Sequence, residues 1–118
     1  MDNVILQDVK KYLGINPDPE DDTFDTSIVM FINSAIDDLA RIGLGDLGKF
    51  RVETKTETWS DYLGSNYSDL VSTVKPYVSI YVKMHFDTNQ GTLQNALESE
   101  IARLEFTIQT YIEQKDEE

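Results

Sequence analysis

The side chain best suited to acid–base chemistry is the single histidine, His85. An imidazole acts as a general base when a substrate and an orienting partner are held against it, and a metal site needs further ligands around it. Asp87 follows two residues later, and residues two apart on a helix do not face the same way. Because the surrounding segment is apolar, we interpret His85 as a structural residue.

A second candidate for chemistry is an acidic cluster whose carboxylates are suitable ligands for a hard cation. Its members are Asp18, Glu20, Asp21, Asp22 and Asp25. The cluster lacks the glycine and the closing glutamate of a calcium-binding loop, so we expect a solvated turn that leads into a helix.

Other catalytic and cofactor-binding patterns are missing from the sequence. There is no cysteine, which excludes disulfides and thiolate metal sites. There is also no phosphate-binding loop, no GxGxxG pattern and no nucleophile elbow. We therefore expect no metal, no cofactor and no enzymatic activity.

Charge is the strongest global feature of the chain. Twenty-two acids oppose 10 bases, which gives the 118 residues a formal net charge of −12. A field of this sign repels phosphate backbones, so ordinary nucleic-acid binding is disfavoured. The open readings are a charge for solubility, a surface that DNA slides past, a surface that mimics DNA, and a surface that pairs with a basic partner.

The length fits a single domain over residues 1–118. No apolar run approaches the roughly 20 residues that span a bilayer. The first residues have neither the basic region nor the long apolar stretch of a secretory signal. We expect no membrane contact.

Helical periodicity predicts four helices, at residues 3–13, 23–42, 74–86 and 92–113. Asp22 or Thr23 can cap the second helix, and Pro76 falls in the first turn of the third, where its missing N–H costs little. The third helix is apolar almost all round, which is typical of a helix surrounded by others. The pattern predicts a mainly α fold, a small bundle of about four helices, with a flexible acidic tail at 114–118.

A different pattern occupies residues 44–73. From Phe50 to Thr58, charged residues alternate with residues that are apolar or threonine. This is the two-residue period of a strand. A single strand needs a partner, either in a hairpin or on another subunit. The aromatic residues Trp59, Tyr62 and Tyr67 follow. The segment is either a long loop or short β-hairpin arm that reaches a neighbour, or a lid folded over its own core.

The order of several short strings resembles the phage head–tail connector family. These strings are Ile15-Asn16-Pro17-Asp18, then Ile32-Asn33-Ser34-Ala35-Ile36-Asp37-Asp38-Leu39, Ile42-Gly43, Phe86-Asp87 and Leu104-Glu105. The resemblance covers most of the chain and is weakest across 44–73.

The resemblance implies a structural virion component that is assembled in the host cytoplasm and lies at the head–tail interface. It implies a homo-oligomeric ring of about a dozen copies that docks on the portal protein and meets the tail-completion protein. DNA would pass through the ring without specific binding, and acidic walls suit such a channel.

Three sets of residues follow as candidates for these contacts. For the subunit interface we predict Phe50, Val52, Thr54, Trp59 and Tyr62. For the portal contact the resemblance points to the final helix and tail, at Phe106, Tyr111, Ile112 and Lys115. For the channel wall we predict either the C-terminal acids or Asp18, Glu20, Asp21 and Asp22.

Two further functions compete with this one. An acidic inhibitor that mimics DNA, of the anti-restriction type, would also carry a strong negative charge, although Arg51 and Lys55 interrupt the acidic surface. Another small phage assembly adaptor would show a similar bundle.

Overall fold

The computed structural model describes residues 4–15, 23–65, 67–86 and 91–116, with side chains except at 46, 91–94, 115 and 116. Its helices are α1 (Ile5–Leu13), α2 (Asp25–Ile42), α3 (Trp59–Leu63), α4 (Val71–Phe86) and α5 (Gly91–Asp116). Two short 3-10 turns, η1 (Gly45–Leu47) and η2 (Ser68–Leu70), lie between them. The prediction of a mainly α bundle is confirmed.

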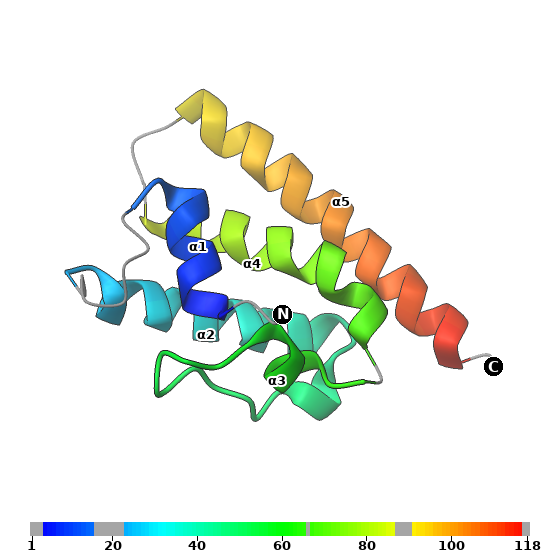
Figure 1. The fold of residues 1–118 in the computed structure, drawn as a ribbon. Helices are drawn as coiled ribbons and strands as arrows, with labels where there is room; N and C mark the ends of the chain where they lie inside the picture. The colour runs from blue at the N-terminus through cyan, green and yellow to red at the C-terminus, as the bar shows by residue number, and fades with distance from the viewer. Residues whose placement is uncertain (1–3, 16–22, 66, 87–90, 117–118) are drawn as a thin grey trace.

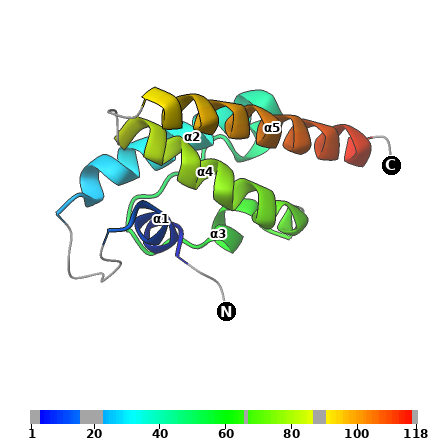
Figure 2. The same cartoon turned by 90° about the horizontal axis from the view of Figure 1, so that it is seen from above.

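Helix α4 is the central element of the bundle. It packs against α1, α2, α3 and α5 (Figures 1 and 2). Val74, Tyr77, Val78 and Val82 on α4 are buried, because neighbouring helices cover most sides of it. The helix begins at Val71, three residues earlier than predicted, so Pro76 lies inside it rather than in its first turn.

The prediction that Thr23 caps α2 is wrong. The residue at the N-cap position is Phe24, which makes no side-chain capping bond, and Asp22 lies outside the described residues. The first residue of the helix, Asp25, turns into the core instead, where it meets a lysine of α1.

Helix α5 extends beyond the other helices at its C-terminal end (Figure 1). It has 26 residues, which corresponds to a length of about 39 Å. Leu104 and Ile108, on the side of α5 that faces the other helices, are buried. Ile112 packs on Gly43 at the end of α2. Residues 114–116 belong to this helix rather than to the predicted tail.

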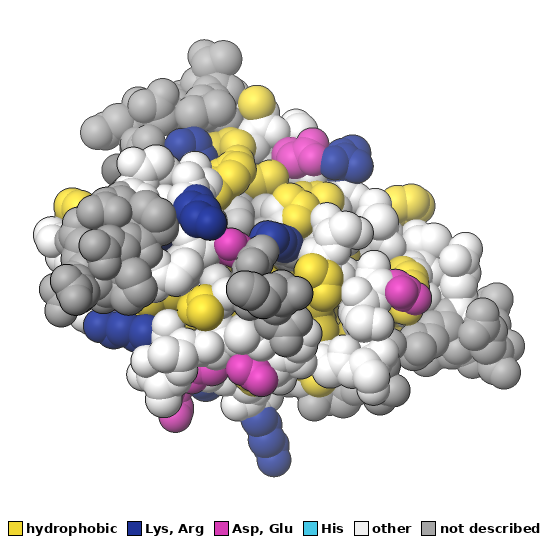
Figure 3. Space-filling view, in the orientation of Figure 1, with side chains coloured by type: hydrophobic (Ala, Val, Ile, Leu, Met, Phe, Trp, Pro, Cys, Tyr) yellow, Lys and Arg dark blue, Asp and Glu magenta, His cyan; other side chains and the backbone are white. Residues whose placement is uncertain are grey.

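The face formed by α1, α4 and α5 carries a strip of hydrophobic side chains between α1 and α5. Figure 3 shows Lys and Arg side chains beside this strip. Of the large apolar side chains described, Tyr12, Phe24, Met30 and Phe106 are the exposed ones.

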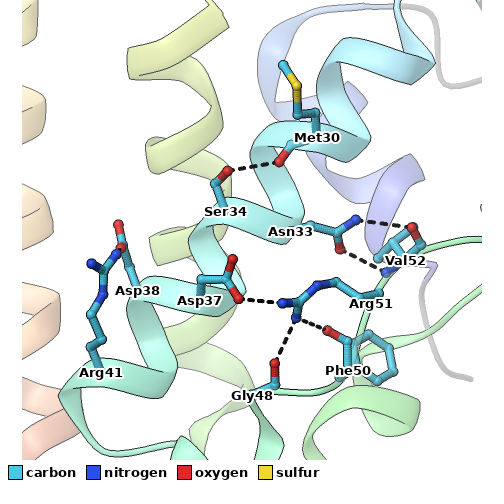
Figure 4. Close-up of polar contacts among 10 residues, drawn as sticks. All are labelled: Met30, Asn33, Ser34, Asp37, Asp38, Arg41, Gly48, Phe50, Arg51 and Val52. Carbon is cyan, nitrogen blue, oxygen red and sulfur yellow. Dashed lines mark hydrogen bonds and ion pairs between the residues drawn. The ribbon is translucent and has the colours of Figure 1, made fainter.

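The strand predicted at 50–58 is wrong: no residue of the described ranges belongs to a strand. Val52 is held by a side chain instead of by a second strand. Its N–H donates to Asn33 Oδ1 at 2.8 Å, and Asn33 Nδ2 donates to its carbonyl at 3.2 Å (Figure 4). We call this pair of bonds the Asn33 clamp.

The alternation fails physically at Lys55, whose φ of 70° reverses the chain. The Glu57 carboxylate closes the turn by accepting from the N–H groups of Glu53 and Thr54. The chain then returns to α1 through one isolated bridge between Val4 and Thr58.

Helix α3 was not predicted. Thr58 and Asp61 form a capping box at its start, each side chain accepting from the other's backbone N–H. The helix places Trp59, Tyr62 and Leu63 in the core. Residues 50–63 are therefore folded over the bundle, which is the lid alternative.

Candidate functional site

His85 lies on the exposed side of α4 in a small aromatic group. Its ring stacks on Tyr81 at a centroid distance of 4.4 Å and lies 5.6 Å from Phe31. Its Nδ1 is 2.8 Å from the Tyr81 carbonyl oxygen. Because a carbonyl only accepts, Nδ1 carries the hydrogen in this bond. The contacts are those of a packed side chain.

No group of three or more His, Asp or Glu side chains is placed to hold a metal ion in the part of the chain that the structure describes. The acidic residues 18 and 20–22 of the predicted channel wall lie outside that part. Their role stays a prediction.

A buried ion pair joins α1 to the start of α2. Lys10 Nζ lies 3.0 Å from Asp25 Oδ1, and the two side chains are 1% and 2% exposed. Lys55, from the turn at 53–57, approaches the other carboxylate oxygen at 3.7 Å. Because a buried charge is costly without a counter-ion, these contacts fix the turn over the junction of the two helices.

A second polar group joins α1 to α3 and α4. Asp8 Oδ2 accepts from Trp59 Nε1 at 2.8 Å and lies 3.2 Å from Lys75 Nζ. The indole is 3% exposed, so its N–H needs an acceptor inside the protein.

Residues 48–52 are anchored on α2 by polar contacts (Figure 4). Arg51 donates to the carbonyls of Gly48 and Phe50 and, at 2.6 Å, to Asp37 Oδ1. With the Asn33 clamp, these bonds tie the segment to the outer side of α2.

The residues predicted for the subunit interface come together around this segment, although mostly inside the subunit. Val52, Trp59 and Tyr62 are buried, and Phe50 lies half-buried against Tyr62 at a centroid distance of 5.1 Å. Thr54 alone of the five is exposed. Three of these side chains thus offer almost no surface in the folded subunit, and the interface itself stays a prediction.

The residues predicted for the portal contact fall on the distal half of α5. Phe106 is 70% exposed. It lines a hollow of about 330 Å³ together with Thr107, Thr110, Tyr111 and Gln114. Ile112 is half-buried against Gly43, and the side chain of Lys115 is outside the described set.

Three pKa shifts follow from these surroundings. Burial raises the pKa of the Tyr77 hydroxyl, and the Glu105 carboxylate, 3.4 Å away, raises it further. Partial burial and the Glu100 carboxylate raise the pKa of Tyr12, so α1 lies close to α5 there. Burial favours the neutral form of Glu57, but its backbone N–H donors outweigh burial and lower its pKa.

The sequence did not indicate that the side chains of Tyr12, Phe24 and Met30 are exposed.

The pairing of bases with acids was not predicted either. Six of the 10 bases make ion pairs within the described residues, namely Lys10, Arg41, Arg51, Lys55, Lys75 and Arg103. Because the 22 acids outnumber the 10 bases, these pairs still leave a large excess of acidic side chains.

Within the described residues, no helix combines the length and the apolar character needed to cross a membrane. A comparison with curated proteins found no match, and a comparison with solved structures found none either. The family model described as "Phage connector protein" matches residues 5–115, which is nearly the whole chain. This helical protein, with its buried polar contacts and its exposed distal α5 surface, therefore belongs to the phage connector protein family, whose members are structural components of the virion.

Proposed function

We propose that the chain is one subunit of a homo-oligomeric ring at the joint between phage head and tail. The ring docks on the portal protein and extends its DNA channel toward the tail-completion protein. The observation that carries this proposal is the family match over residues 5–115. The role requires surfaces that hold neighbours in place, and it requires no catalysis.

The charge of the chain supports the channel part of the proposal. The formal net charge is −12, because 22 acids outnumber 10 bases. An acidic wall repels the phosphates of passing DNA, so the DNA moves without being bound. The wall would be formed by Asp18, Glu20, Asp21 and Asp22 or by the C-terminal acids.

The distal half of α5 supports the assembly part of the proposal. Phe106 is the most exposed of the large hydrophobic side chains described, and it adjoins the hollow at Tyr111. Solvent-exposed aromatic side chains beside a hollow are typical of protein-binding surfaces. We propose that this surface engages an adjoining component of the particle.

Electron microscopy tests the proposal directly. The purified chain is imaged in negative stain alone and after mixing with the portal protein of the same phage, and native mass spectrometry counts the copies. We expect closed rings in at least one of the two samples. A mixture of the portal with an unrelated acidic protein of similar size is the control.

A chain that stays monomeric in both samples would refute the ring. Tight, salt-sensitive binding to a basic DNA-binding enzyme, without any ring, would point to the DNA-mimic function instead.

A further inference from the structure

The distal surface of α5 combines an apolar group with a negative charge. We define it by Phe106, Thr110, Tyr111 and Glu113. Glu113 lies seven residues after Phe106, so both side chains project from nearly the same side of the helix. Glu113 is exposed and has no ion-pair partner among the side chains that are described.

A second surface has the opposite charge. We call it the lysine face and define it by Lys11, Tyr12, Lys75 and Lys83. Lys75 reaches across to Asp8 on α1 at 3.2 Å. Lys11 is one turn beyond Asp8, and Lys83 is roughly two turns beyond Lys75. Tyr12 is 44% exposed.

The lysine face is unusual for so acidic a protein. Lys11 and Lys83 have no ion-pair partner within the described ranges, whereas most other bases do. Figure 3 shows Lys and Arg side chains beside the hydrophobic strip of this face. Asp and Glu side chains lie there as well (Figure 3), but Asp8 is paired with Lys75 and Glu100 with Arg103. The positive charge open to a partner therefore comes from Lys11 and Lys83, and together with the exposed Tyr12 it is complementary to the distal α5 surface.

The two surfaces are too far apart to meet within one subunit. Figures 1 and 2 both place α1 near one end of the molecule and the C-terminal end of α5 at the other, along a longest dimension of 44 Å. Unlike surfaces at opposite ends of a molecule make a head-to-tail contact, which closes into a ring if its rotation permits.

From this complementarity we infer that the distal α5 surface of one copy docks on the lysine face of a second copy. Phe106 packs against Tyr12 of the neighbouring copy, and Glu113 pairs with Lys11 of that copy. The inference rests on the proposed ring and names its contact. It assigns the distal surface to a sister subunit rather than to the portal.

A charge swap tests the contact. Lys11→Glu and Glu113→Lys are made singly and together, and the concentration at which half of the protein is assembled is measured by sedimentation velocity, with portal added if the ring requires it. Each single reversal places like charges opposite one another, so we expect it to raise this concentration by at least about tenfold. The double variant restores the pair and should return to within about threefold of the unmodified protein.

Matched variants control for general effects of charge and apolar loss. Phe106→Ala should weaken assembly by about tenfold, whereas Met30→Ala, which also removes an exposed apolar side chain, should not. Lys49→Glu reverses an exposed lysine away from the lysine face and should leave assembly unchanged. Circular dichroism checks that every variant is folded.

Weaker assembly of both single variants, with recovery of assembly in the double variant, supports the inference. Rings that form normally in both single variants overturn it while leaving the proposed ring intact. Variants that keep self-association but lose portal binding also overturn it, in favour of the portal as the partner. A chain that never assembles overturns the ring and this contact together.

Discussion

Replacing Asn33 with alanine removes the clamp that holds Val52. The change deletes two hydrogen bonds, at 2.8 and 3.2 Å, and leaves the N–H and carbonyl of Val52 without their partners. A typical hydrogen bond contributes about 0.5–1.5 kcal/mol net, and an unsatisfied buried group costs about 1–3 kcal/mol. Both bonds are partly buried, so water replaces them only in part. We expect the free energy of unfolding to fall by about 2 kcal/mol.

The single tryptophan provides the assay. Trp59 is buried next to Asp8, and its fluorescence reports on the segment at 50–63 during urea titration. Far-ultraviolet circular dichroism reports on the helices in the same samples. Because Arg51 still anchors the segment to Asp37, the variant should fold with its helices intact.

Ser34→Ala is the matched control for the Asn33 variant. Ser34 is the next residue on α2, and its hydroxyl donates only to the Met30 carbonyl of the same helix. The change should alter stability by less than about 0.5 kcal/mol. If Asn33→Ala proves as mild as this control, the clamp does not hold the segment on α2.

Other changes probe the packing and the buried charges. Gly43→Ala should destabilise the fold by about 2 kcal/mol or more in urea titrations, because φ is 148° there and a Cβ would lie 2.5 Å from Ile112 Cδ1. Lys10→Met should cost about 3 kcal/mol on thermal or urea unfolding, since Asp25 then keeps its burial without its closest counter-ion. The lowered pKa of Glu57 stabilises the fold above the ordinary glutamate pKa of about 4.3, and this contribution is lost as the pH falls through the lower folded value. Acid titration followed by Trp fluorescence should show this loss of stability. The Glu57→Gln variant should not show it, because its side chain does not titrate.

The glycine and lysine changes each have a comparison in the same chain. Gly64→Ala introduces a side chain at φ 64° where no atom lies within 4 Å, so its effect measures backbone strain alone. Lys49→Met removes an exposed lysine and should be nearly neutral. If Lys10→Met is equally neutral, the buried pair is not needed for stability.

Periodicity was sufficient to predict the long helices because their apolar stripes are local. It located α1, α2, α4 and α5 to within three residues, with the largest errors at the start of α4 and the end of α5. The short helix α3 left a local signal too, the Thr58-x-x-Asp61 capping box, which the alternating pattern before it obscured.

The contacts that fix the segment at 44–63 were beyond prediction because they join distant parts of the chain. The alternation at 50–58 indicated a strand, but Val52 is held by an amide on α2 rather than by a second strand. Lys10 and Asp25 meet only after two helices have packed. The same folding buries Trp59 and Tyr62, which the sequence alone suggested as interface residues.

The Asn33 clamp has a consequence for how this part of the chain changes during evolution. Asn33 binds main-chain atoms, and every amino acid except proline supplies both the N–H and the C=O that it grips at position 52. Of the exposed residues that follow, from 53 to 56, Lys55 is constrained by its positive φ and by its contact with Asp25. The other three can diverge while the path of the backbone is retained. A segment held in this manner can change its exposed side chains to suit a different phage particle without a change in the helices beneath it.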